Sequence, residues 1–599
     1  MASGIFPPNR RIANTSLMKN ASGREALLWR ATFFMLGVTT LMSVCVLRLA
    51  QLQLVEGQYN QNLAEQNRVR PIPVPAERGN IVDRNGKLLA SNRLSRAVYL
   101  WPRQQSRNEW RETATRLGAI LNIPSQEILD KLEQAGYNSP LPVRVSQQLS
   151  QTAFVAMAEQ ATQLPGVEII AGSSRHYPYN QLASHVMGYI GEASEEDMQA
   201  NPSYPSGMIV GQMGVERMAN DRLEGAWGSR LVEVNAGGQE IRLLGSKEAV
   251  AGSQVRLTLD VDLQQAAERA LNGRRGAAVA LNVNTGEVLA LASNPAFDPN
   301  IFTRRVSQTE WQALQEGDQP FLNRALQGYP PGSTFKIVTA TAGMQSGKFS
   351  PSSRIGTSAY LSMGGIQFWE HSKHGYGVIG FKEALAVSSN TFFFRVGLTV
   401  GAEQVAKWGK ILGIGTTKLG LEGESLGLIP TPDEKEELYD EPWYAGDTVS
   451  MSIGQGLVQV SPLELAVMSA AIANGGWRVK PHLLADQTNT PATERVATGI
   501  DPGTIETIQA GMVAVVQQGT GKRLNDGSIP LTAGKTGTSE VVGRKSHALF
   551  VGYGPAADPQ IAIAVIVENG GYGGVAALPV AHEIYKVYFG RSAQPAKQD

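Results

Sequence analysis

The sequence predicts an α+β protein carried on a single N-terminal membrane helix, with more than one domain in its 599 residues. Three observations predict it. A run of 17 uncharged residues, Ala31–Leu47, stands near the N-terminus. A region punctuated by Pro and Gly follows, and the pattern changes near Val250. Beyond that point strand patterns stand at both ends and helical patterns fill the middle, which favours one antiparallel sheet with helices packed on it.

The N-terminal run predicts a retained, single-pass anchor. Together with Ala26–Trp29 it approaches the roughly 20 residues that span a bilayer, and Arg30 can reach the interface. A cleaved signal peptide is the alternative, but its apolar region is usually about 7–15 residues long and ends at a small-residue site, which is not evident here. We predict a cytoplasmic tail over residues 1–25 and a span over 26–47, because the positive-inside rule applies to four preceding basic residues: Arg10, Arg11, Lys19 and Arg24.

Bulk composition excludes two classes of function. Basic and acidic residues balance at 53 each, so no net field attracts nucleic acid. Cys45 is the single cysteine, which excludes an internal disulfide and a cysteine-based metal site. We expect no cofactor and no metal.

Residues 48–250 are predicted to form an elongated pedestal domain. In the stretch Pro71–Asn92, Asn85-Gly86 is typical of a hairpin turn between the short strand patterns around Ile81 and Leu89. Residues 107–165 have the apolar spacing of amphipathic helices.

Residues 251–590 are predicted to form the sheet-and-helix domain, with a polar tail over 591–599. A strand, Val255–Leu259, turns helical after Asp260. The remaining predicted elements are two strand pairs and a last helix: Gly276–Val283 with Gly286–Ser293, Ser546–Gly554 with Gln560–Glu568, and Pro579–Phe589.

The segment Tyr329–Ala340, YPPGSTFKIVTA, holds a candidate nucleophile and its base. The prolines and glycine place Ser333 near the first turn of a helix, where free N–H groups favour developing negative charge. Lys336 lies three residues on, on the same face, and can act as a base if its pKa falls. The same spacing recurs at Ser16 and Lys19, and a helix cap is the alternative for Ser333.

Two further motifs favour the catalytic interpretation. Ser388-Ser389-Asn390 follows Ser333, and Lys535-Thr536-Gly537-Thr538 stands before the terminal strands. Each is weak alone, but the ordered set Ser-x-x-Lys, Ser-x-Asn, Lys-Thr-Gly is the signature of acyl-serine transferases and β-lactamases.

The chain resembles the class B penicillin-binding proteins, monofunctional D,D-transpeptidases of peptidoglycan, from the anchor to about residue 590. The resemblance implies a penicillin-binding/β-lactamase-like transpeptidase domain on a dimerisation-type pedestal. Stretches near Gly427–Pro432 and Trp443–Gly456 are similar to the elongation-type group, penicillin-binding protein 2; the division-type group, penicillin-binding protein 3, is the rival. The pedestal carries three further motifs of the class: Pro75–Ala90, Arg175–Pro178 and Gly211–Glu216.

The resemblance implies a role for each motif residue. Ser333 would be acylated by a stem peptide ending in D-Ala-D-Ala, and Lys336 would take its proton. Ser388 and Lys535 would relay that proton to the leaving D-alanine, with Lys535 also lowering the pKa of Lys336. The substrate-binding residues are implied to be Asn390 for an amide, Thr536, Gly537 and Thr538 for the terminal carboxylate, and the N–H groups of Ser333 and Thr538 for the oxyanion.

Other polar residues receive weaker interpretations. Gly454-Gln455-Gly456 is expected to shape a loop beside the cleft or to serve packing alone. Some relatives hold a metal near Trp369–His371 and His374 with a cysteine ligand, which this chain lacks, so no metal is expected there. His547 is expected to be structural.

Four alternatives remain besides the division-type enzyme: a membrane-anchored D,D-carboxypeptidase, a β-lactamase, a penicillin sensor, and a non-catalytic scaffold. A bifunctional enzyme is rejected, since residues 50–250 show no glycosyltransferase motif. The resemblance therefore implies a polytopic membrane glycosyltransferase of the shape, elongation and division (SEDS) type as a partner, together with β-lactam inhibition. It places the catalytic domain outside the inner (cytoplasmic) membrane of a bacterium.

Overall fold

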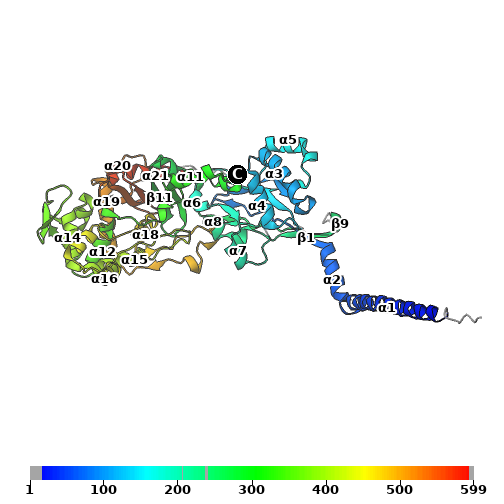
Figure 1. The fold of residues 1–599 in the computed structure, drawn as a ribbon. Coiled ribbons are helices and arrows are strands. Elements are labelled where there is room, and N and C mark those ends of the chain that lie inside the picture. The colour runs from blue at the N-terminus through cyan, green and yellow to red at the C-terminus, as the bar shows by residue number, and fades with distance from the viewer. Residues whose placement is uncertain (1–16, 140, 206, 236–239, 593–599) are drawn as a thin grey trace, which may run out of the picture. The chain divides into compact units, whose positions relative to one another are not determined.

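The computed structural model describes residues 17–139, 141–205, 207–235 and 240–592 (Figure 1). The chain divides into two compact units, residues 1–73 with 229–247, and residues 74–228 with 248–599. The predicted tail over 1–25 lies outside the described residues for its first 16 positions. The predicted polar tail lies outside them from residue 593 onward.

The first unit contains the apolar N-terminal helix. Helix α1, Leu17–Ala50, continues through a π-helical turn, Gln51–Val55, and is followed by α2, Gly57–Arg68. Within the described part of the chain, 27–55 is the one helical stretch long and apolar enough to cross a membrane, with a mean hydropathy of 1.9. The unit also holds a sheet of order β1-β8-β9, with strands Val69–Val74, Gly228–Val234 and Glu240–Lys247.

The second unit begins with the pedestal sheet. The predicted hairpin is confirmed: β2, Ile81–Val82, pairs antiparallel with the start of β3, Leu88–Leu100. The long strand β3 then pairs with β5, Val167–His176, and with β4, Val143–Ser146. Strand β10, Val255–Arg256, runs parallel to β2, so the start of the next domain is part of this sheet.

The predicted amphipathic helices of the pedestal are confirmed. They are α3, Arg107–Leu121, α4, Ser125–Ala135, and α5, Gln151–Glu159, and they bury their apolar faces around Trp110. Shorter elements complete the pedestal: α6 Ser184–Met187, β6 Ile190–Glu192, α7 Glu195–Ala200, β7 Ile209–Gly211, α8 Gly214–Met218 and α9 Asn220–Leu223.

A five-stranded antiparallel sheet of order β12-β11-β21-β20-β19 lies at the centre of the predicted sheet-and-helix domain (Figure 1). Both predicted strand pairs are confirmed, and so is the α+β class. The Lys-Thr-Gly segment precedes these last strands, as predicted, and itself forms the edge strand β19. The strands are β11 Gly276–Asn282, β12 Val288–Asn294, β19 Ala533–Ser539, β20 His547–Gly554 and β21 Ile561–Val567.

Helices bury both faces of this sheet, which is why its strands are apolar at nearly every position. In β21, Ile563 and Val565 face a core shared with α10, Val261–Leu271, and α21, Leu578–Ser592. Alternate residues such as Ala564 belong to the core of the other face, where α18, Pro462–Ala473, is buried along its whole length.

On that second face α12, Lys336–Gln345, packs against four further helices of this domain, α13 Phe381–Val387, α14 Asn390–Val400, α15 Ala402–Ile411 and α19 Pro502–Gln517. Two short strand pairs precede the Ser-x-Asn motif: β13 Arg354–Gly356 with β16 Val378–Gly380, and between them the hairpin of β14 Tyr360–Met363 with β15 Ile366–Trp369. The other helices and strands are α11 Gln308–Glu316, α16 Pro432–Tyr439, α17 Ala445–Ser452, β17 Trp477–Arg478, β18 Val496–Ala497 and α20 Gly573–Ala576.

Candidate active site

The candidate nucleophile lies in a tight turn against the edge strand. Ser333 belongs to a 3-10 turn, Gly332–Phe335, that leads directly into α12, as the prediction of a first-turn position requires. Gly332 has φ +53°, and a Cβ there would lie 2.5 Å from the carbonyl oxygen of Thr538. Only glycine allows this turn to approach β19 so closely, so the Pro-Pro-Gly sequence presses Ser333 against the Lys-Thr-Gly strand.

Lys336 is completely buried one turn behind Ser333. Its Nζ donates to the carbonyl oxygen of Ser388 at 2.7 Å, to Ser388 Oγ at 3.2 Å and to Asn390 Oδ1 at 2.7 Å. These three bonds use all three N–H donors of an ammonium, so the proton of Ser333 can be accepted only after Lys336 has lost one of its own. The structure thus places Ser388 and Asn390 of the predicted Ser-x-Asn motif in contact with the candidate base, Lys336.

The chain geometry of the Ser-x-Asn motif turns its two outer side chains toward Lys336. Ser388 ends α13 in the left-handed conformation, with φ +59°, and Asn390 is the first residue of α14. Ser389 between them is the cap, and its Oγ accepts from the N–H of Phe392 at 3.3 Å. The break between two helices therefore exposes Ser388 and Asn390 on one side.

Lys535 reaches the same serine from the edge strand β19. It is also completely buried, and its Nζ donates to Ser388 Oγ at 2.9 Å and to the carbonyl oxygen of Thr536 at 2.9 Å. Ser388 Oγ therefore accepts from both lysines, which occupies its two lone pairs and leaves its own O–H to donate elsewhere. A hydroxyl bridging two amines is suited to pass a proton between them.

Burial lowers the pKa of both lysines. It lowers the pKa of Lys336 to about 7, against an opposing effect of the Glu370 carboxylate. It lowers the pKa of Lys535 well below its ordinary value, and the charge of Lys336 lowers it further. We predicted that Lys535 would lower the pKa of Lys336. The pKa of Lys336 is lowered, with burial as the main cause, and the repulsion between the two neighbouring ammonium groups disfavours having both lysines charged.

The predicted carboxylate-binding residues line β19. Thr536 is buried and Thr538 half-buried, and Thr536 Oγ1 lies 2.5 Å from Thr520 Oγ1. A Cβ on Gly537 would lie 3.0 Å from the Pro331 carbonyl oxygen and 2.9 Å from Thr334 Cγ2. The glycine of this motif therefore admits the nucleophile turn, as expected for a strand glycine next to another backbone.

The Gly-x-Gly loop braces the nucleophile turn. The N–H of Gly332 donates to the carbonyl oxygen of Gly454 at 2.9 Å, and Gln455 Nε2 donates to that of Thr538 at 3.4 Å. Both Gly454 and Gly456 have positive φ values. The loop therefore packs on both Gly332, next to Ser333, and Thr538 of β19.

Sequence analysis missed the role of Glu370. This carboxylate is 1% exposed and accepts hydrogen bonds from the start of α14. Thr520 was missed as well, because a lone threonine after α19 carries no signal in sequence.

Within the described residues, no group of three or more His, Cys, Asp and Glu side chains could hold a metal ion. His374 Nδ1 contacts the Gly375 carbonyl oxygen instead.

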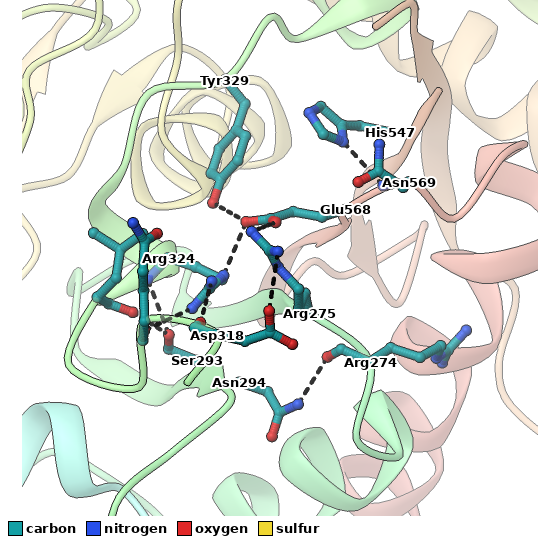
Figure 2. A network of polar contacts seen from close by, with 12 residues as sticks. Arg274, Arg275, Ser293, Asn294, Asp318, Arg324, Tyr329, His547, Glu568 and Asn569 are labelled. Carbon is teal, nitrogen blue, oxygen red and sulfur yellow. Dashed lines mark hydrogen bonds and ion pairs between the residues drawn. The ribbon is translucent and has the colours of Figure 1, made fainter. Parts of the chain in front are cut away.

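A partly buried polar network supports the segment that leads into Ser333 (Figure 2). Glu568, which follows β21, binds Tyr329 OH at 2.9 Å, Arg324 Nε at 2.9 Å and Arg275 Nη2 at 2.8 Å. His547 Nδ1 accepts from the N–H of Asn569 at 3.0 Å, which confirms the expected structural histidine.

The same chain is similar to characterised proteins over nearly its whole length. Residues 276–586 match the penicillin binding protein transpeptidase domain, and residues 73–257 match the penicillin-binding protein dimerisation domain. The peptidoglycan D,D-transpeptidase MrdA of Acinetobacter baumannii is 35% identical, over 91% of this chain and 85% of its own length.

Two solved structures have the same fold. Penicillin-binding protein 2 of Helicobacter pylori in complex with MreC superposes with a TM-score of 0.77 at 26% identity, over 88% of this chain and 99% of that one. A chain from a study of polymerization and crosslinking by a peptidoglycan synthase complex has a TM-score of 0.70 at 30% identity, over 96% of this chain and 100% of that one.

The chain belongs to the class B penicillin-binding proteins, a family of serine-type transpeptidases. Within that family the relatives named above are of the penicillin-binding protein 2 (MrdA) group rather than the division-type group that sequence analysis left open.

Proposed function

We propose that this chain is the peptidoglycan D,D-transpeptidase of cell-wall elongation and that Ser333 forms its acyl-enzyme. The observation that carries the proposal is the Ser388 hydroxyl, which is held at 3.2 Å from Lys336 Nζ and 2.9 Å from Lys535 Nζ. Such a bridge supports proton transfer from the attacking group to the leaving group.

In the acylation step, neutral Lys336 accepts the proton of Ser333 Oγ while that oxygen attacks the carbonyl carbon between the two D-alanines. The backbone N–H groups of Ser333 and Thr538 hold the oxyanion, a contribution usually worth a few kcal/mol. When the intermediate collapses, the C–N bond breaks. The proton passes through Ser388, with the help of Lys535, to the amine of the departing D-alanine.

The remaining motif residues position the stem peptide. Asn390 binds a substrate amide, and the hydroxyls of Thr536 and Thr538 bind the terminal carboxylate beside Gly537. Thr520 orients Thr536 through their hydroxyl contact of 2.5 Å. Binding at several points holds the scissile bond near Ser333, which lowers the entropic part of the barrier.

The amine of a neighbouring stem peptide then attacks the acyl-enzyme, forms the cross-link and releases Ser333. Glu370, the carboxylate that contacts the Ser-x-Asn motif, accepts five hydrogen bonds from residues 371 and 389–391. Its oxygens are committed and do not serve as a base for water. This observation disfavours the β-lactamase and carboxypeptidase alternatives.

Labelling with a fluorescent penicillin tests the nucleophile. The wild-type protein should be labelled on the peptide that contains Ser333, and Ser333→Ala should not be labelled. Ser16→Ala, at the second Ser-x-x-Lys, is the matched control and should be labelled normally. Label retained by Ser333→Ala would contradict the assignment. Cross-linked product on lipid-linked glycan, formed with a polymerase present, separates a transpeptidase from a β-lactamase.

The anchor and the polymerase partner belong to the same proposal. The apolar helix over 27–55 supports a single-pass anchor that places the catalytic domain outside the cytoplasmic membrane. The likeness to a peptidoglycan synthase complex and to the protein solved with MreC supports a SEDS-type glycosyltransferase and an MreC-like protein as partners.

Two measurements test this arrangement. Protease added to intact spheroplasts should digest the catalytic domain, and protection would contradict the orientation. The polymerase should co-purify with the full chain and not with a variant lacking residues 26–250. Retention by that variant would contradict the predicted contact.

A further inference from the structure

Glu370 is a buried carboxylate that touches the catalytic machinery without being part of it. It directly follows β15 and is 1% exposed. Oε1 accepts from the backbone N–H groups of His371 at 3.1 Å and Asn390 at 2.7 Å. Oε2 accepts from Ser389 Oγ at 2.7 Å and from Thr391 N and Oγ1 at 3.0 and 2.9 Å. Four of these five donors belong to the cap and first two residues of α14.

These contacts fix the helix on which Asn390 stands. Free N–H groups and the positive end of the helix dipole favour a carboxylate at a helix N-terminus. The carbonyl oxygen of Trp369, one residue earlier, accepts from Asn390 Nδ2 at 3.0 Å. The amide of Asn390 is therefore oriented with Oδ1 toward Lys336 Nζ, at 2.7 Å. Residues 369 and 370 thus hold both the backbone and the side chain of Asn390.

The charges around Lys336 are few. Lys535 faces it from β19 and Glu370 from the loop after β15, while α13 and α14 present Ser388, Asn390 and the ring of Phe393 at 5.8 Å. The titratable neighbour of Glu370 is His371, whose ring lies against Tyr572 at 5.9 Å. Burial lowers the pKa of Lys336, and Glu370 is the group that raises it.

We propose that Glu370 is a positioning residue of the transpeptidase reaction, which orients Asn390 and Ser388 through the start of α14 and supplies a negative charge close to Lys336. It acts through these residues and contacts no reacting atom. The inference rests on the proposed roles of Ser333 and Lys336 and assigns Glu370 a part in setting the pH at which Lys336 works.

The test measures the rate of acylation by a fluorescent penicillin against pH, on the full-length protein. In Glu370→Gln the negative charge is lost, so neutral Lys336 is favoured and the midpoint of the acidic limb should fall by about one pH unit. The maximal rate should fall about 10- to 100-fold, because Asn390 and Ser388 are held less accurately.

Two variants complete the design. Glu370→Asp keeps the charge but has a shorter reach, so it should keep the wild-type midpoint and lose maximal rate. Glu464→Gln is the matched control, because Glu464 lies in the first turn of α18, is equally buried, and accepts from the N–H groups of the cap Ser461 and of Gly415 and Gly427 in two loops. It should keep both the wild-type midpoint and the wild-type rate. Thermal melts establish that each variant is folded.

The outcomes separate this inference from the proposed function. A folded Glu370→Gln with the wild-type midpoint overturns the role of Glu370 while Ser333 labelling stands. An equal shift in Glu464→Gln overturns it as well. If Glu370→Gln does not fold, a wild-type maximal rate in Glu370→Asp overturns the inference, and a reduced rate at an unchanged midpoint supports it. Absence of label on Ser333 in the wild-type protein would instead contradict the proposed function.

Discussion

Two clusters of buried charge in the second unit differ in what they can do. The pedestal cluster consists of Arg78, Arg175, Tyr177 and Glu216, all at most 8% exposed. Glu216 lies 2.6 Å from the Nε of each arginine and accepts from Tyr177 OH at 3.1 Å. The lysine pair of the cleft, Lys336 and Lys535, is buried as deeply, but its shared partner is the neutral hydroxyl of Ser388.

The difference follows from residue type rather than from burial. Burial alone would raise the pKa of Glu216, but Arg175 and Arg78 hold it below its usual range. Arginine does not lose its proton in proteins, so the pedestal cluster stays ionised and serves structure. Lysine can lose its proton when buried beside a like charge, and the pair in the cleft is therefore available for proton transfer.

Replacing the base of the lysine pair should have the largest effect. Lys336→Met should reduce the rate of acylation by a penicillin about 10³- to 10⁴-fold, since no other group removes the Ser333 proton. Thermal stability should be unchanged or higher, because a buried amine is replaced by an apolar side chain of similar size. Lys336→Arg keeps the positive charge but cannot accept a proton, so it should be as inactive as Lys336→Met. Near-normal acylation by the arginine variant would contradict the role of base.

Breaking the pedestal cluster should affect stability instead. Glu216→Gln leaves two guanidinium groups buried without their anion and should cost about 3–5 kcal/mol in the free energy of unfolding, measured by denaturant titration. The acylation rate per folded molecule should stay within about twofold of wild type. Glu112→Gln, which removes the exposed partner of Arg116, is the control and should cost about 0.5 kcal/mol or less. Equal losses in both variants would contradict the distinction.

The sequence revealed the local parts of both clusters but not their assembly. Ser333 and Lys336 lie one helical turn apart, so their proximity follows from spacing alone. By contrast, 138 residues separate Arg78 from Glu216, and 147 residues separate Lys535 from Ser388. Contacts at such separations depend on how the elements pack, which no local pattern contains.

Strand β19 and Glu370 illustrate two further reasons. The sequence AGKTGTS lacks the apolar alternation of a strand, because it consists of small and polar residues and its glycines admit neighbouring groups. Glu370 is one of many acidic residues, and only the fold brings it to the start of α14. Three pedestal motifs were recognised by resemblance, and the structure explains them, since each supplies members of one cluster: Arg78, Arg175 with Tyr177, and Glu216.

The lysine pair should also make both acylation and stability depend on pH. Acylation needs neutral Lys336, whose pKa is about 7, so its rate should rise about tenfold per pH unit up to that value and then level off. Between about 7 and the ordinary value of 10.5 the unfolded chain binds this proton and the folded chain does not, so this group adds stability as pH rises through that window. Acylation rates and melts measured across pH provide the test, and a rate that stayed constant below pH 7 would contradict it.

A third cluster indicates that the residue types in a cluster, rather than the domain in which it lies, decide whether it serves structure or proton transfer. Glu568 lies between Arg324 and Arg275 and accepts from Tyr329 OH, which repeats the set of one carboxylate, two arginines and one tyrosine found in the pedestal (Figure 2). Tyr329 is only four residues from Ser333. Burial, then the charge of Glu568, raises the pKa of this tyrosine, so its hydroxyl acts as a donor and not as an acid.

Removing the two tyrosine hydroxyls should have the smallest effect and tests this equivalence directly. Tyr329→Phe and Tyr177→Phe each delete one hydrogen bond to a carboxylate that keeps its two arginines, so each should cost about 1–3 kcal/mol in unfolding free energy. Neither should move the pH midpoint of penicillin acylation, although Tyr329 belongs to the catalytic domain. A shifted midpoint in Tyr329→Phe alone would assign the third cluster to the catalytic machinery, and location would then matter more than composition.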